Sequence, residues 1–112
     1  MIYFIQAGED GPIKIGFTNQ PIKKRLSELQ TGNPYKLKVL FVYKGHTVTE
    51  IRLHWLHRHH CIRGEWFKNV EEIHTEIRSL KAKQSFESLF GQGFSDEYKK
   101  KINKLSVEAW KD

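Results

Sequence analysis

Hydrophobic and polar positions near the start of the chain follow the two-residue period of β-strands. Residues 2–5 (IYFI) are a short β-prone run, and residues 8–12 (GEDGP) have the composition of a turn. From Ile13 onward the pattern alternates, so that Ile13, Ile15 and Phe17 share one face. Two strands joined by a turn predict an antiparallel hairpin.

Helical periodicity follows the hairpin. Ile22, Leu26 and Leu29 recur at the spacing of a helical stripe, Pro21 suits a first helical turn, and Gly32 is typical of a helix end. We therefore expect a helix between Pro21 and Gly32.

A third strand and a second helix are expected next. Residues 36–43 (KLKVLFVY) contain the residues that favour strands. Thr47 and Glu50 have the spacing of a capping box, which predicts a helix that begins near Thr47 and runs through residues 51–60 (IRLHWLHRHH). The apolar residues of this helix predict packing in two directions. One side carries Val48, Ile51 and Trp55, and the other carries Leu53 and Leu56.

The last part of the chain is predicted to be helical. Asn69 and Glu72 have the spacing of another capping box, and they introduce an apolar stripe formed by Val70, Ile73, Ile77 and Leu80. Residues 90–95 (FGQGFS) are typical of a hinge. Ser95 would cap a final lysine-rich helix, whose apolar face consists of Tyr98, Ile102, Leu105 and Ala109.

Together these elements predict an α/β fold of the α+β kind. We expect a three-stranded antiparallel sheet flanked by helices, followed by a C-terminal helical extension. A length of 112 residues fits one small domain and an appendage, which we place at residues 1–69 and 70–112.

The excess of basic over acidic residues lies entirely in the first of these two parts. Residues 1–69 carry 11 basic and 5 acidic side chains, whereas residues 70–112 carry 8 of each. A small domain with concentrated positive charge indicates a polyanionic partner, and the phosphate backbone of a nucleic acid is the commonest one. A basic surface that only keeps the protein soluble is the alternative.

Cysteine content and the N-terminal sequence indicate the compartment. Cys61 is the only cysteine, so no disulfide can form within the chain, and a reducing cytoplasmic location is expected. The N-terminus has no basic region followed by an apolar stretch of signal-peptide length, and no segment is long enough to span a bilayer. We expect no contact with a membrane.

Arg25 lies beside the apolar stripe of the first helix. At about 100° per residue, Arg25 is about 60° from Ile22 and about 40° from Leu29, whereas Lys24 points away. An arginine in this position can lay its stem over the core and reach water. It can also be held against the sheet, where its planar donors bind a phosphate. Helix geometry alone favours the first interpretation.

Glu50, His54 and His57 share one stripe of the second helix, because they are spaced at i, i+4 and i+7. Glu50 has two interpretations that spacing cannot separate. It can be a capping-box residue, or it can be the carboxylate that holds Mg²⁺ or Mn²⁺ together with water and substrate phosphates.

Two further groups of residues are candidates for metal binding or catalysis. Residues 57–61 (HRHHC) contain zinc-ligating types, but neighbouring helical positions point apart and no second pair of ligands with zinc-finger spacing exists elsewhere, so a zinc site is disfavoured. Tyr3 can approach the Lys14 face of the hairpin, and a lysine near a phenol favours the ionised phenol, which can act as a base.

Several short motifs, in order, resemble the GIY-YIG nuclease superfamily, most closely its small phage-type branch. They are residues 2–5 (IYFI), residues 13–16 (IKIG), Arg25 within residues 23–29 (KKRLSEL), residues 29–34 (LQTGNP), residues 50–54 (EIRLH) and residues 63–67 (RGEWF). The resemblance covers residues 1–69, which it implies to be a nuclease-like domain.

The resemblance implies a divalent-metal-dependent DNA endonuclease with a sheet flanked by helices. By motif, Tyr3 would lie near the attacking water, Arg25 would bind the phosphate, and Glu50 would be the metal ligand. Lys14 replaces a tyrosine of the family pattern and would support Tyr3 or bind the phosphate, and His54 is the candidate for proton transfer.

A nucleic-acid-binding module without catalysis is the alternative function. Phosphate contacts would then come from exposed basic residues, for which the candidates are Lys23, Lys24, Lys36, Lys38 and Arg63. The C-terminal segment can also bind a protein partner or a second copy of the chain through its aromatic residues, or these residues can cover the core. The aromatic residues in question are Phe86, Phe90, Phe94 and Trp110.

Overall fold

A computed structural model describes residues 1–90, except the side chain of Phe90. The chain divides into two compact units, Met1–Lys81 and Ala82–Asp112. The boundary that the sequence suggested, after Asn69, lies earlier in the chain than this division. The described part of the second unit is the end of one helix.

The described residues form an α+β fold, as the sequence predicted. Its elements are β1 (Ile2–Ala7), β2 (Ile13–Phe17), α1 (Ile22–Gln30), β3 (Leu37–Tyr43), α2 (Thr47–Leu56), a 3₁₀ turn η1 (Arg58–His60), β4 (Cys61–Arg63), β5 (Trp66–Phe67) and α3 (Glu71–Phe90).

The sheet is antiparallel with the strand order β3-β1-β2-β5-β4, so it has five strands where the sequence predicted three. The two additional strands form a tight hairpin that turns at Gly64, whose φ is +58°. They contain only three and two residues, too few to show alternation in the sequence. Their position is set by pairing with β2, which is a non-local contact.

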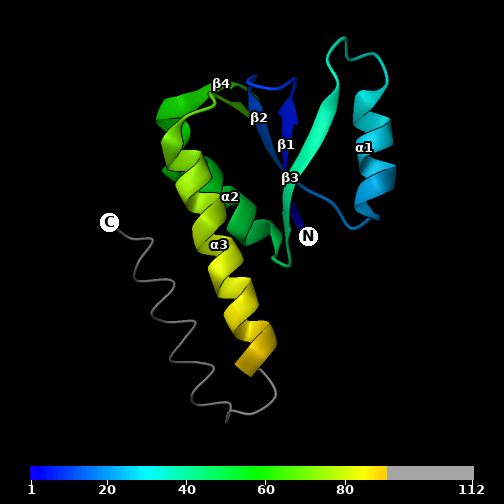
Figure 1. The fold of residues 1–112 in the computed structure, drawn as a ribbon. Coiled ribbons are helices and arrows are strands. Elements are labelled where there is room, and N and C mark those ends of the chain that lie inside the picture. The colour runs from blue at the N-terminus through cyan, green and yellow to red at the C-terminus, as the bar shows by residue number, and fades with distance from the viewer. Residues whose placement is uncertain (91–112) are drawn as a thin grey trace. The chain divides into compact units, whose positions relative to one another are not determined.

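Helices cover both faces of the sheet (Figure 1). On one face, Tyr3 and Ile5 of β1 belong to an apolar cluster against which α1 packs through Ile22, Leu26 and Leu29. The opposite face is covered by α2 and the first turns of α3. The residues buried on that side include Ile13, Ile15, Leu53, Phe67, Ile73, Ile77 and Leu80.

The second helix begins at Thr47, as predicted, but its capping and its end differ from the prediction. Its N-cap is His46, with extended backbone and no side-chain capping bond, so the Thr47–Glu50 capping box is wrong. The helix ends at Leu56 because His57 leaves the helical conformation, with φ −102° and ψ 15°. The third helix begins at Glu71, and Asn69 contacts Asp10 and His74 through its side chain.

The second helix packs in one direction, not in the two that the sequence predicted. Leu53 is fully buried, whereas Val48, Ile51 and Trp55 are each more than 60% exposed. The periodicity identified two apolar sides correctly, but periodicity alone does not tell which side meets the core.

Some expectations for the C-terminal part lie outside the described residues. These are the hinge after Phe90, the helix from Ser95 to Ala109, and the positions of Phe94 and Trp110. In the part of the chain that the structure describes, no helix combines the length and the apolar character needed to cross a membrane.

The fold predicts a large difference between two apolar residues of α2. Replacing Leu53 by alanine should lower the free energy of unfolding by about 2–4 kcal/mol, because it opens a cavity in the core. Ile51→Ala, on the exposed side of the same helix, should change it by less than about 0.5 kcal/mol. Urea unfolding followed by circular dichroism measures both, and equal losses would contradict the observed packing.

Candidate functional site

The edge of β2 changes its hydrogen-bond partner in the middle of the strand. β5 pairs only with Ile13 and Lys14. At the next residue, the N–H of Ile15 donates to the carbonyl of Glu65 (3.0 Å), and the carbonyl of Ile15 accepts from Nε2 of His54 (2.7 Å). Because a buried carbonyl needs a donor, His54 takes the place of a neighbouring strand and anchors α2 to this edge.

Charged side chains gather at the same edge. Glu50 lies one helical turn before His54, with 3.7 Å between Oε1 of Glu50 and Nε2 of His54. Glu65, from the turn between β4 and β5, lies within hydrogen-bonding range of Glu50, and its Oε2 is 2.9 Å from Nζ of Lys14. Two carboxylates, one ammonium and one imidazole therefore form a single cluster.

Glu65 was missed by the sequence analysis. The residue occurs in the RGEWF motif, but nothing local indicates its partner, because the contact with Lys14 depends on how β5 pairs with β2. The pairing of Trp66 with Lys14 places the preceding glutamate at the ammonium group.

The surroundings of Glu50 disfavour its ionised form. Burial is the main cause that raises the pKa of Glu50, and the nearby charge and hydrogen bond of Glu65 add to it, while His54 and Lys14 act in the opposite direction. Only 17% of the Glu50 side chain is exposed. Since α2 has no side-chain capping bond, helix capping does not explain this partly buried carboxylate.

Tyr3 and Arg25 form a second group. Nε of Arg25 donates a hydrogen bond to the phenol oxygen of Tyr3 (3.3 Å), and Nη1 donates to Glu28 (3.3 Å). The bond with Tyr3 is the main cause that raises the pKa of Arg25. Tyr3 is fully buried, whereas 33% of the Arg25 side chain is exposed. Arg25 is therefore held at the sheet and does not simply reach into water, which helix geometry alone had favoured.

Gly16 connects the two groups. It lies opposite Tyr3 across the β1–β2 ladder, and the Tyr3 phenol fills the space where a side chain of residue 16 would begin. Gly16 follows Lys14 by two residues, about 7 Å along the strand. Both groups thus converge on three consecutive residues of β2. We call them the β2-edge site, which consists of Tyr3, Lys14, Arg25, Glu50, His54 and Glu65.

Lys14 has a different partner from the one expected. Its ammonium pairs with Glu65 and lies 5.6 Å from the centre of the Trp66 ring. The cation that contacts the Tyr3 phenol is Arg25.

The chemistry of the two carboxylates suits a hard divalent cation. The described residues contain no cluster of three or more histidine, cysteine, aspartate or glutamate side chains able to hold a metal. Mg²⁺, however, is commonly held by one or two carboxylates, with water and substrate oxygens completing its shell. The mutual repulsion of Glu50 and Glu65, reflected in the raised pKa of Glu50, is of the kind that a cation relieves.

The residues of the HRHHC segment have separate partners. Nε2 of His57 lies 3.1 Å from Glu76, and Nε2 of His60 lies 3.9 Å from Glu72. The thiol of Cys61 donates to the carbonyl of Gly64.

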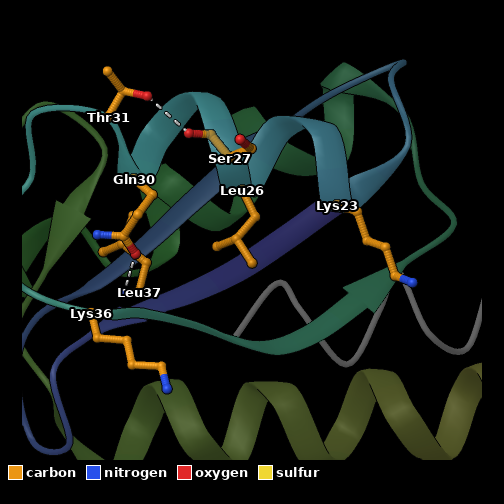
Figure 2. A pocket seen from close by; sticks show the side chains of 7 residues that line it. All are labelled: Lys23, Leu26, Ser27, Gln30, Thr31, Lys36 and Leu37. Carbon is orange, nitrogen blue, oxygen red and sulfur yellow. Dashed lines mark hydrogen bonds between the residues drawn. The ribbon is translucent and has the colours of Figure 1, made fainter.

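The five basic residues proposed to bind nucleic acid are all exposed, but they do not form one patch. These residues are Lys23, Lys24, Lys36, Lys38 and Arg63. Lys23 and Lys36 line a hollow of about 610 Å³ between α1 and the start of β3, together with Gln30 and Leu37 (Figure 2). Arg63 lies in β4, at the opposite edge of the sheet from β3.

Removing the charge of Glu50 should stabilise the protein at neutral pH. A raised folded-state pKa means that the ionised form is disfavoured in the native state, so the stability that Glu50 contributes is present at low pH and is lost as pH rises through the folded pKa. Glu50→Gln should therefore raise the urea midpoint at pH 7, and this gain should disappear near about pH 3, where glutamate is protonated. Glu9→Gln, at an exposed glutamate, serves as the control. A gain in the urea midpoint of Glu50→Gln that does not depend on pH would contradict a raised pKa of Glu50.

A methyl group at position 16 should disturb the Tyr3 phenol. Gly16→Ala should lower the free energy of unfolding by about 1–3 kcal/mol, because the added carbon overlaps a buried ring in a packed core. A double-mutant cycle with Tyr3→Leu, measured by urea unfolding, should give a coupling of more than about 0.5 kcal/mol. If the effects of Gly16→Ala and Tyr3→Leu on the free energy of unfolding are strictly additive, the added methyl group does not act through the Tyr3 ring.

Comparison with known proteins gives one match. The family model of the T5orf172 domain matches residues 1–106. No curated protein and no solved structure matches the chain. The match is to this family and not to the GIY-YIG nuclease superfamily, which corrects the resemblance drawn from the short motifs, and it extends well beyond residue 69. The chain belongs to the T5orf172 domain family.

Proposed function

We propose that this protein is a divalent-metal-dependent DNA endonuclease that hydrolyses phosphodiester bonds. The observation that carries the proposal is the convergence of a phenol–guanidinium pair and a partly buried carboxylate pair on Lys14, Ile15 and Gly16 of one strand. Phosphodiester hydrolysis needs both kinds of group, because positive charge must stabilise the phosphate and carboxylates must hold a metal.

Arg25 is the proposed phosphate ligand. Its hydrogen bonds to Tyr3 and Glu28 fix the orientation of the guanidinium, and its partial exposure allows a phosphate oxygen to reach it. A guanidinium fixed in advance loses little side-chain entropy when it binds, which makes it effective at stabilising charge.

Tyr3 and His54 have different proposed roles. Tyr3, after its own phenol proton has passed to solvent, would receive the proton of the attacking water, and the hydrogen bond from Arg25 would compensate the negative charge of the phenolate. Nε2 of His54 must carry a hydrogen to donate to Ile15, so this nitrogen is not free to act as a base. His54 is therefore proposed as a positioning residue for Glu50.

Glu50 and Glu65 are the proposed ligands for Mg²⁺ or Mn²⁺. When bound, the cation would polarise a phosphate oxygen and neutralise the charge that develops on it. Lys14 holds Glu65 in place through its 2.9 Å contact and leaves Glu50 as the less compensated carboxylate.

The proposed reaction adds one water molecule across a phosphorus–oxygen ester bond. The water oxygen bonds to phosphorus and gives up one proton, for which Tyr3 is the acceptor. The ester bond to the departing sugar oxygen breaks, and that oxygen takes up one proton from solvent.

DNA binding is proposed to depend on the excess of basic residues in the first 69 positions. A binding module without catalysis is the second candidate, because the hollow with Lys23 and Lys36 can hold a phosphate without any metal. A cytoplasmic location, and contact of the C-terminal segment with a protein partner or a second copy, complete the proposal.

Cleavage is expected to require Glu50 and a divalent cation. The wild-type protein should nick supercoiled plasmid in Mg²⁺ or Mn²⁺ and fail to do so in EDTA. Glu50→Ala should reduce the rate by at least about 100-fold, because removing a ligand of the metal removes its charge from the phosphate. Gel analysis of plasmid nicking over time measures the rate.

The matched control is Glu9→Ala, an exposed glutamate in the turn between β1 and β2 that does not belong to the β2-edge site, and this variant should cleave like the wild type. Cleavage by Glu50→Ala at the wild-type rate would contradict the proposed centre. DNA binding that weakens with salt, without cleavage by any variant in any metal, would favour the binding module.

A further inference from the structure

An apolar stripe on α2 is exposed beside the β2-edge site. Val48, Ile51 and Trp55 are 65%, 68% and 63% exposed, and they follow one another at i, i+3 and i+7 on a single side of the helix. Contiguous exposed apolar residues of this size usually mark a binding surface.

Trp55 in this stripe is held in place by an arginine. Cζ of Arg58 lies 3.8 Å from the centre of the Trp55 ring, and Nη1 of Arg58 donates a hydrogen bond to the carbonyl of Trp55 (2.9 Å). The guanidinium therefore covers one ring face and fixes the indole, while most of the side chain remains exposed. An immobilised aromatic ring with a cation against it is the arrangement that stacks nucleic-acid bases.

The charge around the stripe favours a polyanion over a protein or a second copy. In the sequence, residues 44–63 contain four basic residues and one acidic residue, which is Glu50. The carboxylates that reach α2 from other elements include Glu65 and Glu76, and they face Glu50 and His57 on the side that is turned away from the exposed apolar stripe. A second copy would bring the same excess of positive charge to the contact and would be repelled. A DNA strand supplies phosphates for the basic residues and unpaired bases for the ring.

The stripe is continuous with the proposed site. At about 100° per residue, Ile51 lies about 60° around the helix from His54, and Trp55 lies about 40° further. Because Glu50 and His54 face the edge of β2, a strand whose phosphate reaches that edge can extend over the neighbouring stripe.

We propose that Trp55, backed by Arg58 and flanked by Ile51 and Val48, is a stacking subsite for an unpaired DNA base. This inference rests on the proposed function and specifies its substrate class, which is single-stranded or locally opened DNA. A base within a closed duplex is stacked on its neighbours and cannot present its face to the ring.

The test measures binding without metal, so it does not depend on cleavage. The full chain is titrated in EDTA into a fluorescein-labelled single-stranded 20-mer and into the same sequence as a duplex, and anisotropy gives both dissociation constants. Trp55→Ala should weaken single-strand binding by about tenfold, the range expected for loss of one stacked base, and duplex binding by less than about twofold. Trp55→Phe should retain most of the affinity, because it keeps an aromatic face.

A second readout separates stacking from charge. The slope of log affinity against log salt should be the same for Trp55→Ala and the wild type, because no phosphate contact is lost. The urea midpoint should also be unchanged, since the side chain is exposed.

Several outcomes would overturn the inference. Unchanged single-strand affinity of Trp55→Ala, or equal loss on both substrates, would remove the subsite. Concentration-dependent self-association of the wild type that Trp55→Ala abolishes in sedimentation velocity, without an effect on DNA, would assign the stripe to a second copy. If the wild type binds single strands selectively through Trp55 but cleaves no substrate, the stacking subsite is supported and the proposed nuclease function is contradicted.

Discussion

The hydrogen bond from Nε2 of His54 to the carbonyl of Ile15 is the contact on which the rest of the site depends. β5 is only two residues long and stops before Ile15, so the carbonyl of a buried residue would otherwise lack a donor. A side chain from α2 satisfies it, and α2 is thereby fixed against the sheet edge. Glu50, one turn earlier, is placed beside Lys14 and Glu65 as a result.

The short length of the β4–β5 hairpin leaves part of the β2 edge without a neighbouring strand. If β5 were longer, its N–H groups would bond to Ile15 and close the edge of β2. Because it stops, Glu65 lies beside Lys14 at this edge, and two residues further along β2 Gly16 leaves room for the Tyr3 phenol. The same feature that adds two strands to the sheet therefore defines where polar side chains can converge.

The sequence predicted the local elements better than it predicted the contacts between them. A short β-prone run identified β1, alternation identified β2, and helical spacing identified α1 and the buried side of α3, because each depends on residues close in the chain. The hairpin with Glu65 could not be found in this way, since its position depends on pairing with β2. Arg25 was ambiguous for the same reason: its angle on α1 is local information, but its bond to Tyr3 is not. Short shared motifs also suggested a family that the match to the T5orf172 domain corrects.

Two features of α2 act against stability, and this supports a role in function. Burial and Glu65 disfavour the ionised form of Glu50, although a neutral residue at that position would avoid the electrostatic penalty. On the adjacent side, Val48, Ile51 and Trp55 expose apolar surface to solvent. Polar residues could replace these three side chains without loss of core packing. A helix selected only for packing would have neither feature, since Leu53 alone is fully buried in it. Proteins retain such locally unfavourable residues mainly where they contact a ligand, and the two features lie on adjacent sides of the same helix, with Glu50 on the side that faces the edge of β2.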